Sequence, residues 1–370
     1  MKNRLGVIYL TLITFFVSCS KSIEVDQSSI SLQIDKSIIL KLDSVTPDYS
    51  HGIHLIETDS VDYISMLNDL NNTIYLYNIE NRKLENKLTY HKGGKGIQND
   101  IMYFLPHNRD SLFLFTHGLF SYLSNFEGEL VDKYPTLDLS FRQSVYATNS
   151  SPLIFRNDQL FYNSIFFGNY DEEYQPLMCY DLKSNAVTTF GGLPPVYFEG
   201  NWGGFPYDYI YHVYDKNNDI IIYSFPAFNE LVVYDFSSSL EYSSKTSFKS
   251  SLTPPFPKGK EVDENSLEWI RKINRTPIFG EIYYDNVNER FYRVYKYPAS
   301  EAEVNKRNPL RKIALLSYST DLEFLGEYIL PEGYYFHTNN YFLYNDSIFI
   351  RVKVDSEDLI KFVSFKLFDL

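Results

Sequence analysis

The sequence has little cysteine, and its basic residues are outnumbered by acidic ones. Two cysteines in 370 residues exclude a small fold that is held together by several disulfides. With 34 lysines and arginines against 47 aspartates and glutamates, the formal net charge is −13. A surface of this sign repels the phosphate backbone of nucleic acids, so we expect no nucleic-acid partner.

Recognisable catalytic and metal-binding motifs are also missing. The sequence contains no HExxH, Walker A, GxSxG or paired CxxC motif, which removes the familiar zinc protease, P-loop, serine hydrolase and zinc-ribbon classes. Asp215, Asn217 and Asp219 have the spacing of a calcium loop, but the positions that require Gly and Glu hold Ile220 and Pro226. The seven histidines are scattered, with no ligand-like pair on a helix. We therefore predict no cofactor and identify no metal ligands.

One long apolar run is present, at the N-terminus. Two positive charges precede the apolar residues 5–17, and Ser18 and Cys19 follow, which is typical of an export signal and too short to span a membrane comfortably. Residues 16–19 resemble the bacterial lipoprotein cleavage box, which implies cleavage before Cys19 and acylation of that residue. The alternative is an uncleaved signal anchor with an incidental cysteine. We predict a signal peptide at 1–18, a flexible tether at 19–29, and a lipid-anchored protein of the cell envelope, at the outer membrane.

The remaining chain is rich in aromatic residues that recur in a pattern. Tyr (33) and Phe (29) are abundant, which favours β-strands. An apolar residue followed three places later by an aromatic one recurs in IYLY, LFSY, LMCY, LVVY, LLSY and FVSF, which end at residues 77, 122, 180, 234, 318 and 365. Four short strands with their turns need about 40 to 50 residues, the period of a propeller blade. The sequence therefore predicts an all-β fold, a single six-bladed β-propeller of four-stranded blades over residues 30–370.

The sixth of these blades has only three strands of its own. The last phrase lies in the stretch 361–370, and no further strand follows it. Near the N-terminus, residues 30–34 and 38–42 alternate apolar and polar side chains and fit no complete blade. A strand left unpaired at a sheet edge invites aggregation, so we predict that one of these two stretches closes the last blade.

These features together resemble a family of proteins. Cys19 in its lipobox-like setting, the six phrases and the glycine-rich connection HKGGKG at 91–96 make the chain similar to the six-bladed propeller lipoproteins of Bacteroides-type bacteria, which are mostly uncharacterised. The resemblance implies fold and location, and it carries no catalytic residues.

The long connections all fall on one face of the predicted ring. They are residues 91–100, 167–175, 190–209, 250–277 and 298–312, and binding sites usually lie on such loops. The fourth connection contains a predicted helical insert near 261–274, in which Asp263 is suited to cap the helix and Leu267, Ile270 and Ile273 recur at helical spacing. The helix could pack on the rim with Trp269 buried against the blades, or it could form a lid over the channel.

Aromatic rings near carboxylates could stack on a sugar or hold a peptide. The candidate ligand-binding residues are Trp202, Phe205, Tyr207, Tyr174, Asp171, Glu172, Glu173 and Trp269. In a chain with 17% aromatic residues, these rings could equally belong to the core.

Two functions remain open. The first is a lipid-anchored, non-enzymatic module that binds or scaffolds a protein, peptide or glycan through its loop-rich face. The second is an envelope hydrolase or lyase whose carboxylates and histidines meet at the mouth of the channel.

Overall fold

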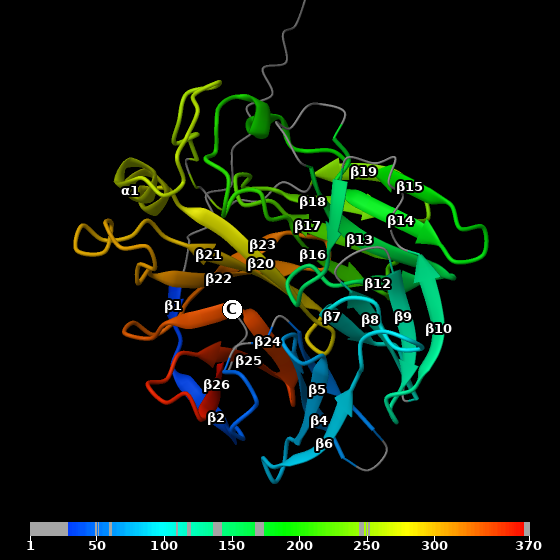
Figure 1. The fold of residues 1–370 in the computed structure, drawn as a ribbon. Helices are drawn as coiled ribbons and strands as arrows, with labels where there is room; N and C mark the ends of the chain where they lie inside the picture. Colours follow the sequence, from blue (N-terminus) through cyan, green and yellow to red (C-terminus); the bar gives the residue numbers. More distant parts are fainter. Residues whose placement is uncertain are drawn as a thin grey trace, which may run out of the picture.

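Six sheets, antiparallel except for one added edge strand, surround a central axis and form a β-propeller, as Figure 1 shows. The computed structural model describes residues 29–365, except for 49, 51, 59–60, 109, 117–119, 136–142, 167–173, 244–247, 249 and 251. The predicted signal peptide, Cys19 and the three acidic candidates 171–173 therefore lie outside the described residues. In the described part of the chain, no helix is long and apolar enough to cross a membrane.

The first three blades follow one another along the chain. Blade one contains β3 (Ile53–Ile56), β4 (Tyr63–Asn68), β5 (Thr73–Asn78) and β6 (Leu84–Thr89). Blade two contains β7 (Ile101–Pro106), β8 (Ser111–Thr116), β9 (Phe120–Asn125) and β10 (Leu130–Pro135). Blade three contains β11 (Gln143–Tyr146), β12 (Ile154–Arg156), β13 (Gln159–Phe166), β14 (Leu177–Asp181) and β15 (Val187–Phe190). Both β11 and β12 pair with β13, so together they form one interrupted inner strand.

The other three blades complete the ring. Blade four contains β16 (Tyr211–Asp215), β17 (Ile220–Ser224), β18 (Leu231–Asp235) and β19 (Leu240–Ser243). Blade five contains β20 (Ile278–Asp285), β21 (Arg290–Lys296), β22 (Ile313–Ser319) and β23 (Phe324–Ile329). Blade six contains β24 (Phe336–Tyr344), β25 (Ser347–Val352) and β26 (Leu359–Phe365), with β2 (Ile34–Lys41) as its outermost strand. The aromatic residues that end the six phrases lie in β5, β9, β14, β18, β22 and β26, so each phrase marks the third strand of its blade, as predicted.

The N-terminal segment pairs with strands of two blades and packs against a third. β2 pairs antiparallel with β26, with Leu40 opposite Ile360. β1 (Ser29–Ser31) pairs parallel with β23 and adds a fifth strand to blade five, which the sequence did not predict. Leu40 is fully buried in a cluster with residues of blades one and six, including Ile53 and Phe362. The segment thus pairs with blades five and six and packs against blade one at the seam of the ring.

The helical insert begins later than expected. α1 spans Leu267–Arg275, and its N-cap is Ser266, whose side chain accepts a hydrogen bond from the backbone N–H of Trp269 at 3.1 Å. The predicted cap, Asp263, instead accepts from the N–H of Asn265 at 2.9 Å, so a tight turn precedes the helix. Figure 1 places α1 at the rim of the ring and away from its centre. A short 3-10 helix, η1 (Pro195–Phe198), was not predicted.

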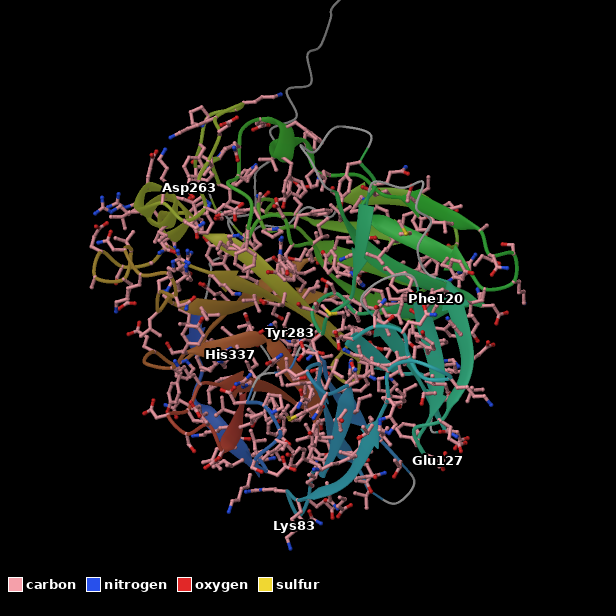
Figure 2. All side chains as sticks on the ribbon, viewed as in Figure 1. Lys83, Phe120, Glu127, Asp263, Tyr283 and His337 are labelled. Carbon is pink, nitrogen blue, oxygen red and sulfur yellow. The ribbon has the colours of Figure 1, made fainter. Side chains whose placement is uncertain are left out.

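The inner strands of three blades carry bulges. The register shifts between Phe279 and Ile282 in β20, between His337 and Tyr341 in β24, and between Ile101 and Tyr103 in β7. Bulges bend a strand and re-aim its side chains, often beside functional sites. Figure 2 shows Tyr283 of β20 near the middle of the ring.

Candidate functional site

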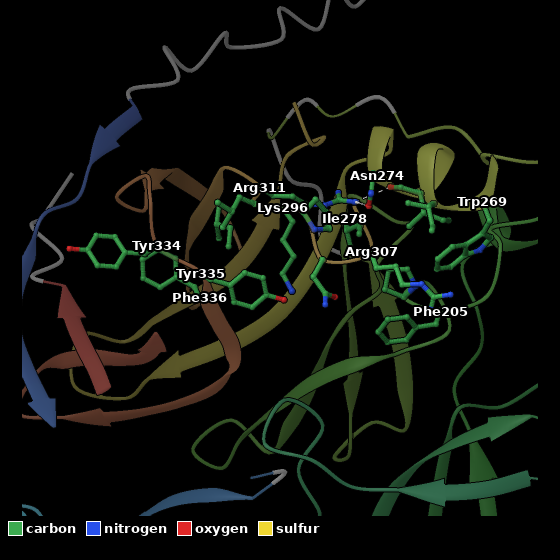
Figure 3. Close-up of a pocket in the computed structure, with 17 residues that line it drawn as sticks. Phe205, Trp269, Asn274, Ile278, Lys296, Arg307, Arg311, Tyr334, Tyr335 and Phe336 are labelled. Atoms are coloured by element: carbon green, nitrogen blue, oxygen red, sulfur yellow. Dashed lines mark hydrogen bonds between the residues drawn. The ribbon is translucent and has the colours of Figure 1, made fainter. Parts of the chain in front are cut away.

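An open cleft lies on the loop-rich face beside α1, and we call it the α1 cleft. It has a volume of about 220 Å³ and is bordered by α1, the end of β21, residues 307–313 and the start of β24. Figure 3 shows Lys296 in its middle, with Tyr334, Tyr335 and Phe336 on one side and Phe205, Trp269 and Arg307 on the other. The cleft therefore gathers residues from four connections that are far apart in the sequence.

Aromatic rings form part of the wall of the α1 cleft. Phe205 is 57% exposed and Tyr334 is 39% exposed, so both rings present a free surface. Trp269 is partly buried, and its indole N–H donates to the carbonyl of Gly203 at 2.6 Å. Because this bond fixes the indole, Trp269 is a rigid part of the wall that a ligand could contact.

The charged residues that line the α1 cleft are all positive. They are Lys296, Arg307 and Arg311, and among the residues that the structure describes neither a carboxylate nor a histidine lines it. Lys296 pairs with Glu281 at 3.3 Å, whereas Arg307 donates to the side-chain oxygen of Asn265 at 3.1 Å. In a protein of net charge −13, three cations in one cleft create a local positive potential.

Arg311 is held rigidly at the floor of this cleft. Its Nη1 donates to the carbonyls of Thr276 (3.0 Å) and Tyr297 (3.3 Å), and its Nη2 donates to the carbonyl of Ile273 (3.0 Å) and the side-chain oxygen of Asn274 (3.1 Å). Two of these acceptors belong to the last turn of α1, where a cation is favoured by the helix dipole. Burial lowers the pKa of Arg311 to about 10. The guanidinium still carries its charge at neutral pH.

Below the cleft, the channel of the propeller is lined by polar and aromatic side chains. Glu281, in the bulge of β20, is only 3% exposed, and its Oε2 has no hydrogen-bond partner among the described residues. Tyr283 donates to the carbonyl of Thr338 at 2.7 Å, and its ring lies 4.0 Å from that of Tyr341. Burial raises the pKa of Tyr283 and Tyr211 well above the ordinary value, and the charge of Glu281 adds to it. Lys296 therefore links the cleft to the channel lining.

Histidines near the axis are kept neutral by burial. Burial lowers the pKa of His54, His212 and His337 to about 4 in each case. The second function that the sequence left open required histidines and carboxylates to meet at the channel mouth. Within the described residues, no three or more His, Cys, Asp or Glu side chains come together in a way that could hold a metal ion.

The structure divides the predicted ligand-binding residues. Phe205 and Trp269 come together in the α1 cleft. Tyr174, Trp202 and Tyr207 are 3%, 4% and 0% exposed, so they do not form the open stacking surface that we expected. Their polar atoms bond to backbone carbonyls instead: Tyr174 to Ser164, Trp202 to Val196 and Tyr207 to Pro277. Buried rings whose polar groups are satisfied in this way serve the core.

Sequence reasoning missed the three cations of the α1 cleft. Arg307 and Arg311 lie at the end of the long connection 298–312, where three basic residues follow Lys306 within six positions. That cluster of charge was a signal that could have been used. Lys296 is the last residue of β21 and does not belong to such a cluster of basic residues.

A second, wider hollow adjoins the loops 197–208 and 258–264. Its volume is about 850 Å³, and Trp202 forms part of its border. Its charged residues are mixed, since Asp208, Glu261 and Glu264 lie there with Lys258 and Lys260. It offers neither a consistent charge nor an exposed ring pair, so we regard the α1 cleft as the better candidate site.

Comparison with known proteins gives a family and a fold. The family described as a domain of unknown function, DUF4221, matches residues 29–329. A DUF4221 member from Bacteroides vulgatus is similar in structure, with a TM-score of 0.76 and 17% identity over 93% of this chain and 100% of that one. A protein from Bacteroides fragilis NCTC 9343 described as exported has a TM-score of 0.53 and 13% identity, over 92% and 99% of the two chains. No curated protein matches the sequence.

Proposed function

The chain belongs to the DUF4221 family of unknown function, and we propose that it is a non-enzymatic binding module of the cell envelope that holds its ligand in the α1 cleft. The observation that carries the proposal is the lining of this cleft. It combines two exposed rings with three cations, and the described part of the lining contains no carboxylate or histidine. Those two residue types supply most general acids and bases, so the cleft is better suited to hold a protein, peptide or glycan than to convert it.

The rigidity of the wall supports the same function. The cleft is built on propeller strands and a capped helix, and Arg311 and Trp269 are fixed by bonds to backbone carbonyls. A pre-organised site loses little conformational entropy when a ligand binds. A rigid scaffold with ligand-binding loops on one face is a common use of such folds.

We also propose that the module is tethered to the membrane through a lipid at Cys19. The support is the sequence of residues 1–19, which has the charged start, the apolar run and the cysteine of a lipoprotein signal. In cells given labelled palmitate, the label should enter the protein and be lost in Cys19→Ser. Cys179 is a matched control because it is buried, so Cys179→Ser should keep the label.

Equilibrium dialysis against mixtures of peptides and oligosaccharides, followed by mass spectrometry, tests the binding function. We expect the protein to retain a subset of the mixture with unchanged masses, and Phe205→Ala to retain at least tenfold less. Recovery of shortened products would instead identify an enzyme. Retention that is the same for the wild type and Phe205→Ala would remove the α1 cleft as the site.

A further inference from the structure

We propose that the ligand of the α1 cleft is an organic anion, a carboxylate joined to an apolar body of about the size of one aromatic side chain. This inference rests on the proposed function and specifies the chemistry of the ligand. It is drawn from the charge, the hydrogen-bonding capacity and the size of the cleft.

The charge of the cleft calls for an anion. Among the described residues, Arg307 and Arg311 form no ion pair with a carboxylate, and Lys296 alone has one, Glu281. A cation withdrawn from water without a counter-ion is costly, and Arg311 is partly buried and has only neutral oxygens as partners. An anion in the cleft would compensate this charge.

The three cations have different tasks. All four Nη hydrogens of Arg311 are used by protein oxygens, so Arg311 acts on the ligand mainly through its charge. Arg307 donates one hydrogen bond to Asn265, and Lys296 donates one to Glu281. Both therefore keep donors for the ligand, and charge-assisted bonds from such donors to a carboxylate are the strong ones.

The polar groups of the cleft disfavour a neutral sugar. Sugar hydroxyls need acceptors as well as donors, and the described lining has no carboxylate, so its side-chain acceptors are the neutral groups of Asn274, Asn308, Tyr334 and Tyr335. Both amide hydrogens of Asn274 are used, since its Nδ2 donates to the carbonyls of Val304 (3.0 Å) and Lys306 (2.8 Å), and its Oδ1 already accepts from Arg311. A carboxylate, which only accepts, matches this donor-rich lining better.

The apolar part of the cleft sets the size of the ligand body. Ile270, Ile273, Ile278 and Phe336 line it together with the exposed ring of Phe205. A volume of about 220 Å³ is below that of pockets for drug-sized molecules, which begin at about 300 Å³. The cleft therefore accommodates one anchoring group. That group could belong to a free aryl carboxylic acid or to the C-terminal residue of a peptide.

The two tryptophans of the chain allow a direct assay. Trp269 borders the cleft, whereas Trp202 is buried outside it, so in Trp202→Phe the emission reports on Trp269. The probes are N-acetylphenylalanine and N-acetylphenylalaninamide, which differ only in charge at the carboxyl group. We expect the acid to bind at least tenfold more tightly than the amide, and its affinity to fall as salt is raised.

Variants at two arginines show whether the effect comes from the cleft. Arg307→Gln, at an exposed position, should weaken binding of the acid at least fivefold. The matched control is Arg275→Gln, because Arg275 is on α1 but outside the cleft and pairs with Glu301 on the surface. Equal affinity for the acid and the amide would overturn the proposal, and so would an unchanged affinity in Arg307→Gln.

Two further probes distinguish a free acid from a peptide C-terminus, and the dialysis result distinguishes failure of the anion inference from failure of the binding function. Similar affinity for 3-phenylpropionate and acetyl-Ala-Ala-Phe would support a free acid, and at least tenfold tighter binding of the peptide would support a peptide C-terminus. Phe205-dependent binding of neutral oligosaccharides alone would overturn the anion inference and leave the binding function standing. No Phe205-dependent retention of any compound would remove the binding function itself.

Discussion

Replacement of Leu40 by alanine tests whether the N-terminal strand β2 stabilises the ring. Leu40 is 0% exposed and packs in the cluster between blades six and one. A buried Leu→Ala change costs about 2 to 5 kcal/mol, because apolar contact is lost and a cavity remains. We expect a loss of about 3 kcal/mol in the free energy of unfolding, since the site lies between two sheets that cannot readily move together.

Ile39 provides the matched control for this prediction. It is the neighbouring residue on β2, pairs with Lys361 of β26 and is 40% exposed. Ile39→Ala removes a side chain of the same size and also lowers strand propensity, but we expect it to cost no more than about 1 kcal/mol. Urea unfolding followed by fluorescence gives both values. If Leu40→Ala is no more destabilising than Ile39→Ala, β2 is not docked into the seam and our reasoning on the closure of the ring is wrong.

Two further perturbations follow from the structure. Gly203 has φ +86°, and a Cβ there would lie 2.9 Å from the ring of Phe256; Gly203→Ala should therefore cost about 2 to 4 kcal/mol in urea unfolding, from strain and overlap. Gly259→Ala should cost only about 1 kcal/mol, because Gly259 has φ +76° and an added Cβ there would meet no atom within 4 Å. Equal losses in the two variants would refute the overlap at Gly203. His212 is 1% exposed, and burial lowers its pKa from 6.5 to about 4. Below pH 6.5 His212 is protonated in the unfolded chain, but in the folded protein it stays neutral until about pH 4. The stability that neutral, buried His212 contributes is therefore complete above pH 6.5 and is lost as the pH falls. Between pH 7 and pH 5, the wild type should lose about 2 kcal/mol more than His212→Gln, and parallel pH profiles would contradict this.

The strands were predictable because their signals are local. Each third strand has its own aromatic phrase and a neighbouring turn rich in Asn and Asp, and these residues take the left-handed backbone that such turns need. Asn157, Asp158, Asp219, Asn345 and Asp346 all have positive φ in turns between first and second strands. By contrast, the alternation at 30–34 indicated a strand but not its partner, because the parallel pairing of β1 with blade five leaves no mark in the local sequence.

The site was harder to predict because it depends on which loops converge. Phe205 and Arg307 are about a hundred positions apart, and only the ring brings their loops to one cleft. The buried rings of Trp202 and Tyr207 could not be told from exposed ones, because the backbone carbonyls that satisfy them are set by the tertiary fold. The helix began at Ser266 and not at Asp263 for a similar reason, since both residues are good caps locally.

The position of the N-terminal segment has a consequence for how the molecule folds. In the sixth blade, the backbone N–H of Lys36 bonds to the hydroxyl of Ser364, a separation of 328 positions along the chain. Contacts of such long range form slowly, because the entropy of closing a long loop must be overcome first. During synthesis, β2 therefore has no strand to pair with until β26 has been made. The edge of β2 that later pairs with β26 stays exposed over that interval. A chaperone that shields β2 would act in this interval, and the completed ring would no longer offer that edge to it.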